Sequence, residues 1–209
     1  MKDINIISFD VEGTLVTTDF SAAIWFEGIP QSYAARHGIS TEAATKILIS
    51  EYEKISDQRM EWYDVNYWLK RFDLGSPSVL LSRYRDRIKY YPEVSGVLSA
   101  LSQKYTLIVA SGTPRDFLGH LLTEINSYFA QIFSSTSDYK SVKNRNFYSS
   151  ICQEMKTQPH KIVHVGDNRQ FDYESAQEAG MQSYYLNRSA AAEHQYTLNS
   201  LSELIDLLL

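Results

Sequence analysis

The sequence predicts an α/β protein with a mostly parallel sheet and a helical insert after the first strand. Short apolar segments alternate with helical patterns over most of the chain, as in repeated βαβ units. The alternation stops between about residues 20 and 90, where helical patterns follow one another without a strand. The expected strands, which are apolar and rich in β-branched side chains, cover residues 4–10, 105–110, 131–135, 161–167 and 182–187.

The helices expected between these strands cover residues 93–103, 114–127, 146–156 and 172–179. Helical connections of this length bring successive strands into parallel order and cover both faces of the sheet. The core is therefore expected to be a Rossmann-like parallel sheet.

Apolar side chains recur at helical spacing within the insert. One predicted helix face consists of Val65, Trp68, Leu69 and Phe72. Ser76-Pro77 is typical of a helix start, because serine caps the first turn and proline is tolerated at the first helical position. We expect a core domain of residues 1–17 and 91–209 that carries a helical domain of residues 18–90.

The overall composition argues against several classes of partner. The net charge is −5, so the basic excess that binds nucleic acid or an anionic membrane is missing. The single Cys152 cannot form an internal disulfide and fits a reducing compartment. No apolar run is long enough to span a bilayer. We expect a cytoplasmic monomer or homodimer with no nucleic-acid or membrane partner.

Polar side chains gather where the predicted strands end. Ligands of open parallel sheets bind at the carboxyl ends of the strands, so residues that follow different strands can share one site. These residues are, in chain order, Asp10 and Glu12, Ser111 and Gly112, Lys140 and Lys143, and Asp167 and Asp172.

Several carboxylates in one buried site need a compensating cation, because unpaired buried charge is costly. Ligands that are all oxygen favour a hard ion, so magnesium is the expected cofactor. A lysine and helix starts beside such a site would attract an anion. This combination suits phosphoryl transfer.

Four segments, in this order, resemble the motifs of the haloacid dehalogenase superfamily: DVEGT at residues 10–14, SGT at 111–113, Lys143, and GDNRQFD at 166–172. The helical insert falls where that family has its helical cap, and residues 18–90 are called the cap below. Residues 91–101 and 179–188 also resemble family segments, so the resemblance covers nearly the whole chain. It implies a phosphatase.

The resemblance implies that Asp10 is a nucleophile that forms an aspartyl-phosphate, and that Glu12 is the acid and base. It also implies that Asp10 and Asp167 hold magnesium, together with the backbone carbonyl of Glu12. The usual acid in the phosphatases of this family is aspartate. Glutamate is one methylene longer and has a pKa about 0.4 unit higher, so its reach differs but its chemistry is retained.

The resemblance further implies that Ser111 and the Gly112 amide bind phosphate oxygens. The active-site lysine would neutralise the nucleophile and the phosphoryl group. Lys143 fits the family spacing better than Lys140 does. Asp172 would position this lysine or support the metal through water.

We therefore expect a magnesium-dependent phosphohydrolase that acts on a small phosphomonoester, with the substrate left open. Three alternatives remain. A dehalogenase of the same family would attack carbon and needs neither an acid nor a metal. A phosphonate hydrolase would need a lysine from the cap, such as Lys54 or Lys70. A phosphate-binding module would retain the fold without turnover.

Simpler explanations exist for individual features. Thr113 and Asp116 could form a capping box and account for the SGT segment without catalysis. His164, within a predicted strand, and Cys152, beside apolar residues, are expected to be core residues. The cap residues considered as substrate contacts are Phe20, Trp25, Phe26, Tyr63, Tyr67, Lys70 and Arg71.

Overall fold

The computed structural model of the protein describes residues 3–189 and 196–209. Its sheet has the strand order β3-β2-β1-β4-β5-β6, and all neighbouring strands are parallel. The strands are β1 (Ile6–Phe9), β2 (Thr106–Ser111), β3 (Phe129–Ser134), β4 (Ile162–Gly166), β5 (Gln182–Leu186) and β6 (Thr197–Leu198). The predicted α/β fold with a parallel sheet is confirmed.

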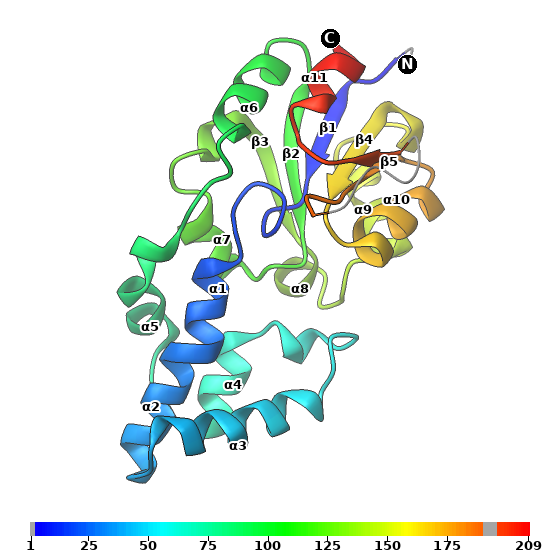
Figure 1. Ribbon diagram of the computed structural model, residues 1–209. Helices are drawn as coiled ribbons and strands as arrows, with labels where there is room; N and C mark the ends of the chain where they lie inside the picture. Colours follow the sequence, from blue (N-terminus) through cyan, green and yellow to red (C-terminus); the bar gives the residue numbers. More distant parts are fainter. Residues whose placement is uncertain (1–2, 190–195) are drawn as a thin grey trace.

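Helices cover both faces of this sheet (Figure 1). One face packs against α6 (Val94–Ser102), α7 (Arg115–Leu121) and α11 (Glu203–Leu208), and the other against α9 (Arg145–Glu154) and α10 (Ser175–Glu178). Successive strand residues alternate between the two apolar clusters, so Ile7 lies in the first and Ile6 in the second. Burial on both faces explains why the strands are almost continuously apolar.

A helical insert follows β1, as predicted, and lies on the side of the sheet away from the two termini (Figure 1). None of the helices in the described residues is long and apolar enough to cross a membrane. The elements of the helical insert are α1 (Asp19–Ala23), a π-helix (Ile24–Gly28), α2 (Ile29–His37), α3 (Thr41–Glu53), a 3-10 turn (Met60–Trp62), α4 (Val65–Phe72), α5 (Pro77–Arg83) and a 3-10 turn (Arg85–Arg87).

Both ends of the insert leave the core together, because Val16 pairs with Tyr90 in a short antiparallel bridge. This pairing supports our proposal that the core and the cap are divided at residues 17/18 and 90/91.

The cap has an aromatic core of its own. The ring of Trp68 is fully buried and packs edge-on against Tyr52, at a centroid distance of 4.7 Å, and stacks on Phe72 at 5.7 Å. Such pairs add to the stabilisation that comes from burying the rings. Ser76 precedes α5 and Pro77 begins it, as predicted, although the Ser76 side chain makes no capping hydrogen bond.

Several predicted boundaries were wrong. The helix expected over 114–127 ends at Leu121, and a 3-10 turn (Asn126–Tyr128) follows. The hydroxyl of Thr123 donates to backbone carbonyls in the last helical turn, a contact that competes with helix continuation. The third strand begins at Phe129 rather than 131.

The helix expected over 172–179 begins earlier, as a π-helix (Arg169–Glu174) that leads into α10. Four short elements carried too little pattern to predict, namely α8 (Ser135–Asp138), a 3-10 turn (Pro159–Lys161), β6 and α11.

The strand order reverses at β1, because β2 lies on one side of β1 and β4 on the other. Parallel α/β sheets bind ligands beyond the carboxyl ends of the strands at such a reversal. The residues that follow β1, β2 and β4 are therefore placed at one edge of the sheet, next to the cap.

We expect Trp68→Ala to lower the free energy of unfolding by about 3–5 kcal/mol, because it leaves a large cavity in the cap core. Urea unfolding followed by circular dichroism measures this. The matched control is Val79→Ala in α5, whose side chain is 65% exposed. It should change stability by less than about 0.5 kcal/mol. Equal effects of the two substitutions would contradict this account of the cap core.

Candidate active site

Asp10 lies directly after β1 and is buried. Its backbone N–H donates to the carbonyl of Val165 in β4 at 2.9 Å, which extends the pairing of the two strands by one residue. Its carboxylate oxygen Oδ1 accepts from the Ser111 hydroxyl at 2.9 Å and from Lys143 Nζ at 2.8 Å. Ser111 ends β2 and Lys143 lies in the loop before α9, so both elements supply a donor to one oxygen atom of Asp10.

Lys143 is buried and makes ion pairs with Asp10 and Asp172. Burial by itself lowers the pKa of a lysine, but here the two carboxylates outweigh it and raise the pKa. Lys143 is therefore a fixed cation at neutral pH. Lys140, the competing candidate, is exposed and has a left-handed backbone with φ 54°. The structure thus brings Lys143 into the site, while Lys140 stays at the surface.

Asp172 is fully buried and accepts hydrogen bonds from several donors. These include the backbone N–H of Asn168 at 3.0 Å and His164 Nε2 at 3.1 Å. Burial alone would raise the pKa of Asp172, but Lys143 and His164 outweigh burial and lower it. The residue is therefore an ionised anchor for the lysine.

His164 is buried within β4, as predicted for a core residue, and its two ring nitrogens are both paired. Because an ionised carboxylate can only accept, Nε2 must carry the hydrogen that points at Asp172. The other ring nitrogen, Nδ1, is hydrogen-bonded to the Ser8 hydroxyl at 2.9 Å. The Tyr148 hydroxyl lies 3.0 Å from Nε2 and closes this buried network. The network fixes the orientation of Asp172.

Two glycines allow the acidic side chains to approach the backbone. A Cβ at Gly13, where φ is +77°, would lie 2.0 Å from a carboxylate oxygen of Asp167. A Cβ at Gly166 would lie 2.3 Å from Cγ of Asp172. Contacts this short do not occur between real atoms, so both positions require glycine for the acids to stay in place.

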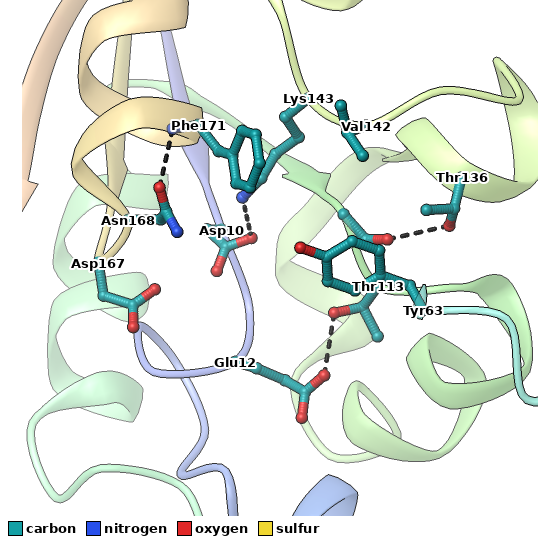
Figure 2. A pocket seen from close by; sticks show the side chains of 11 residues that line it. Asp10, Glu12, Tyr63, Thr113, Thr136, Val142, Lys143, Asp167, Asn168 and Phe171 are labelled. Carbon is teal, nitrogen blue, oxygen red and sulfur yellow. Dashed lines mark hydrogen bonds and ion pairs between the residues drawn. The ribbon is translucent and has the colours of Figure 1, made fainter. Parts of the chain in front are cut away.

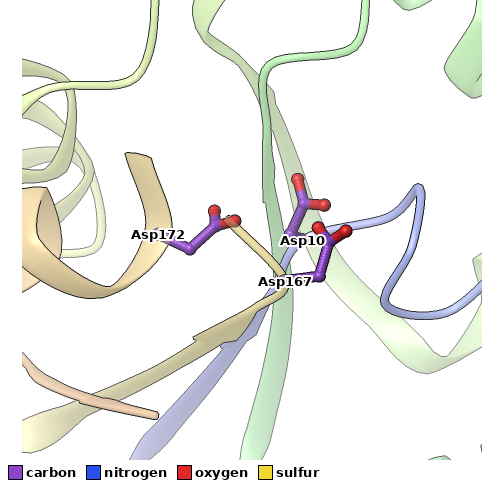
Figure 3. Close-up of side chains that lie close together, drawn as sticks. All are labelled: Asp10, Asp167 and Asp172. Atoms are coloured by element: carbon purple, nitrogen blue, oxygen red, sulfur yellow. The ribbon is translucent and has the colours of Figure 1, made fainter. Parts of the chain in front are cut away.

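Three carboxylates converge at the carboxyl ends of β1 and β4 (Figure 3). One oxygen of each of Asp10, Asp167 and Asp172 lies within 4.8 Å of the other two, so these residues could hold a metal ion. Asp167 lies at the exposed rim. Partial loss of solvent and the charges of Asp10 and Asp172 raise the pKa of Asp167 to about 7.

The carboxylate cluster fits a hard divalent cation. All of its donor atoms are oxygen, and three carboxylates beside one ammonium carry an excess of negative charge. Burial raises the pKa of Asp10, and the charge of Asp172 adds to this effect against Lys143 and Ser111. A cation in the cluster would favour the ionised form of Asp10.

Glu12 lies outside this cluster, and its Oε2 accepts from the Thr113 hydroxyl at 3.0 Å. Burial raises the pKa of Glu12 to about 7, well above its ordinary value of 4.5. A group with a pKa near 7, such as Glu12, can both give and take a proton at neutral pH.

The capping box considered for Thr113 and Asp116 does not form, since α7 is preceded by Pro114 and has no side-chain cap. Asp116 instead accepts a hydrogen bond from Asn66 of the cap at 2.6 Å.

These side chains surround a small cavity of about 160 Å³ (Figure 2). Asp167 lies on one side of Asp10, and Tyr63 of the cap lies on the other, with its ring in the cavity (Figure 2). Gly112 and Thr113 also line it, at the end of β2. Of the cap residues considered as substrate contacts, Tyr63 lines this cavity. Ser111 is not among the lining residues, and its hydroxyl donates to Asp10, which is.

The sequence did not identify some residues that support the site. Arg188 donates to the carbonyls of Gly13 at 3.2 Å and Thr14 at 2.8 Å, and pairs with Glu93 at 2.7 Å. From its position after β5, it thereby holds the loop that carries Glu12. The sequence showed only that Arg188 follows the strand predicted over residues 182–187.

The model of the haloacid dehalogenase-like hydrolase family matches residues 4–180. Among solved structures, the chain is similar to an HAD phosphatase from Thermococcus onnurineus, with a TM-score of 0.88 and 25% identity over 98% of both chains. It is also similar to a 2-haloacid dehalogenase from Pseudomonas syringae pv. tomato, with a TM-score of 0.72 and 21% identity over 98% of both chains. The latter likeness concerns the fold alone.

Two further similarities involve metal and substrate. The HAD-hydrolase YfnB from Bacillus subtilis, a structure bound to magnesium, has a TM-score of 0.68 and 19% identity over 99% of both chains. The GMP/IMP nucleotidase YrfG from Escherichia coli is 23% identical over 73 residues, which are 35% of this chain and 32% of the nucleotidase. The match thus spans about a third of the length of this curated relative.

We expect Gly166→Ala to destabilise the protein by about 1–3 kcal/mol, because the added methyl group displaces the buried Asp172. Urea unfolding gives the size of the effect. The control is Gly96→Ala on α6, where an added Cβ meets no atom within 4 Å. It should be neutral or stabilise the helix by up to about 1 kcal/mol. Gly166→Ala as stable as wild type would show that Asp172 is not held as described.

We expect the stability of the metal-free protein to depend on Glu12. Its folded pKa of about 7 lies above the ordinary 4.5, so folding favours the protonated acid. The associated stability is present below pH 4.5 and is lost as the pH rises to about 7. Unfolding of wild type and Glu12→Gln in EDTA should therefore diverge across this window, with the variant more stable by roughly 3 kcal/mol above it. Parallel curves would contradict the raised pKa.

Proposed function

Because the chain belongs to the haloacid dehalogenase-like hydrolase family, we propose that it is a magnesium-dependent phosphohydrolase that acts on a small phosphomonoester. The observation that carries this proposal is the position of Asp10. Its carboxylate accepts from the Lys143 ammonium at 2.8 Å and belongs to a cluster of three aspartates that could hold a cation. A carboxylate that lines a cavity beside a fixed ammonium is suited to attack an anionic phosphate.

In the first step, a carboxylate oxygen of Asp10 forms a bond to phosphorus, and the bond between phosphorus and the leaving oxygen breaks. Glu12 in its protonated form gives its hydrogen to that oxygen, so the product leaves as an alcohol. Its Oε1 is buried and accepts no hydrogen bond from the described residues. The pKa of about 7 leaves the protonated form well populated at neutral pH.

In the second step, water attacks phosphorus of the aspartyl-phosphate. Glu12, now ionised, takes a proton from this water, and the bond between phosphorus and Asp10 breaks. Orthophosphate leaves, and both carboxyl groups return to their starting states. Lys143 keeps its charge throughout, because its pKa is raised, and it offsets the negative charge on Asp10 and the phosphoryl group.

Asp10, Asp167 and Asp172 would hold magnesium, with the backbone carbonyl of Glu12 as a further ligand. The ion would supply positive charge that screens the phosphate from the carboxylates. Asp172 also serves as a positioning residue, because it holds the lysine through an ion pair and is itself held by His164. Ser111 and the amide of Gly112 are proposed to position phosphate oxygens.

The likeness to an HAD phosphatase and the short match to a nucleotidase support phosphate monoesters as substrates. The fold is also shared with a dehalogenase, whose chemistry would need no acid at position 12 and no carboxylate cluster. Glu12 with its raised pKa and the three converging aspartates therefore favour phosphatase chemistry.

We expect magnesium-dependent release of phosphate from acetyl phosphate, p-nitrophenyl phosphate and GMP, and no release with Asp10→Asn. Lys143→Gln should lower kcat by about 10²–10³-fold, because it removes a positive group at the reacting phosphate. Steady-state phosphate release, with magnesium and with EDTA, measures both effects. Circular dichroism shows whether each variant is folded.

Lys140→Gln is the matched control for Lys143→Gln, since it removes an exposed lysine three residues away and should leave kcat unchanged. A folded wild type that releases no phosphate with magnesium from any of the three compounds would refute the proposal. Release of chloride from chloroacetate in EDTA would instead support the dehalogenase alternative.

A further inference from the structure

A second cavity, of about 470 Å³, lies beside the first and is called the cap cavity. Its volume falls within the range of small-molecule binding sites, roughly 300–1,000 Å³. Most of its wall comes from apolar and aromatic residues of the cap, namely Trp25, Phe26, Ile49, Tyr52, Trp62 and Tyr63. The smaller cavity at Asp10 has room for a phosphate group, and the cap cavity has room for a larger organic group.

The two cavities share two lining residues, Glu12 and Tyr63. Glu12 is the residue proposed to protonate the leaving oxygen, so the rest of the leaving group must lie next to it. A phosphate held at Asp10 therefore directs its alcohol portion past Tyr63 into the cap cavity. This shared boundary makes the cap cavity the place for the leaving group.

The aromatic side chains of the cap cavity are held by one another. The rings of Trp25 and Tyr52 meet edge-on at 5.9 Å, and those of Tyr52 and Trp62 meet edge-on at 6.5 Å. Trp25 also stacks on Phe117 of α7 at 6.1 Å, which connects this wall to the core. A row of fixed rings offers faces and edges to another ring, and such contacts prefer an aromatic guest.

The charges at the cap cavity disfavour an anionic guest. Among the described residues that line it, none is positively charged, and the two acidic ones are Glu12, which is protonated in the first step proposed above, and Glu53. A second phosphate or a carboxylate in this space would meet apolar rings and the acidic Glu53 without a cation to pair with. Exposed apolar side chains, Phe26 and Ile49, lie at its edge.

We infer that the cap cavity binds the leaving group and selects an uncharged alcohol that carries an aromatic ring. This inference rests on the proposed function. It predicts that phosphomonoesters with an aromatic tail are preferred over those with a short tail, and that esters with an anionic tail are poor substrates.

The test compares 2-phenylethyl phosphate, ethyl phosphate and 2-phosphoglycolate, which are all esters of primary alcohols and differ in the tail. We expect kcat/KM for 2-phenylethyl phosphate to exceed that for ethyl phosphate by on the order of ten- to a hundredfold, because a phenyl ring leaves water. Phosphoglycolate should be no better than ethyl phosphate. Calorimetric binding of the same compounds to Asp10→Asn should give the same order of affinity, without turnover.

Two exposed isoleucines of α3 provide a matched pair of variants. Ile49 lines the cap cavity and is 39% exposed, whereas Ile47 does not line it and is 42% exposed. Ile49→Lys should lower kcat/KM for 2-phenylethyl phosphate about tenfold and raise it for phosphoglycolate, because it places a cation beside the tail. Ile47→Lys should change neither.

The outcomes separate the two proposals. Hydrolysis of ethyl phosphate with no preference for the aromatic ester would overturn the inference and leave the phosphatase proposal standing. Equal effects of the two lysine variants would overturn it as well, because the tail would then bind elsewhere. Preferred binding of 2-phenylethyl phosphate that Ile49→Lys weakens, without hydrolysis of any ester, would support the cap cavity and refute the phosphatase proposal.

Discussion

The ion pair of Lys143 with Asp10 and Asp172 is the contact on which the rest of the site depends. It joins three segments that are far apart in the sequence, after β1, before α9 and after β4. Burying three charged groups is costly unless each is paired, and removal of one partner leaves the others uncompensated. The hydrogen bonds from His164 and Ser111 complete this pairing. The same buried charges lie at the edge of the sheet where we propose that a cation and a phosphate bind together.

Much of this arrangement could be predicted from the sequence, for a physical reason. Parallel strands end at one edge, so Asp10 and Asp167 were expected at the same edge once their segments were recognised as buried strands. The structure adds that β1 and β4 are neighbours, which brings the two residues together. The helical insert was visible because its apolar residues change from strand to helix periodicity. The choice of Lys143 over Lys140 rested on the family spacing and on the helix start that directly follows Lys143.

Other contacts could not be predicted, because they join side chains that are far apart in the sequence. Such contacts depend on how the folded elements orient those side chains, and the hydrophobic periodicity of the sequence does not report that orientation. The bond between Thr113 and Glu12 spans 101 positions of the chain, and a local capping box explained Thr113 equally well in the sequence. His164 looked like any polar residue in a strand, and only the fold places its ring against Asp172. The cap cavity likewise forms from side chains of separate helices.

The distribution of tryptophan gives the molecule an optical property. All three tryptophans, Trp25, Trp62 and Trp68, belong to the helical insert, and the sheet and its covering helices contain none. Tryptophan fluorescence, excited selectively over that of the 15 tyrosines, therefore arises from the cap alone, whereas circular dichroism sums over the whole chain. Because Trp25 stacks on Phe117 of α7, a displacement of the cap that separates these two rings would change the surroundings of one of the three emitters. Such a displacement would be detected in the native chain without an attached dye.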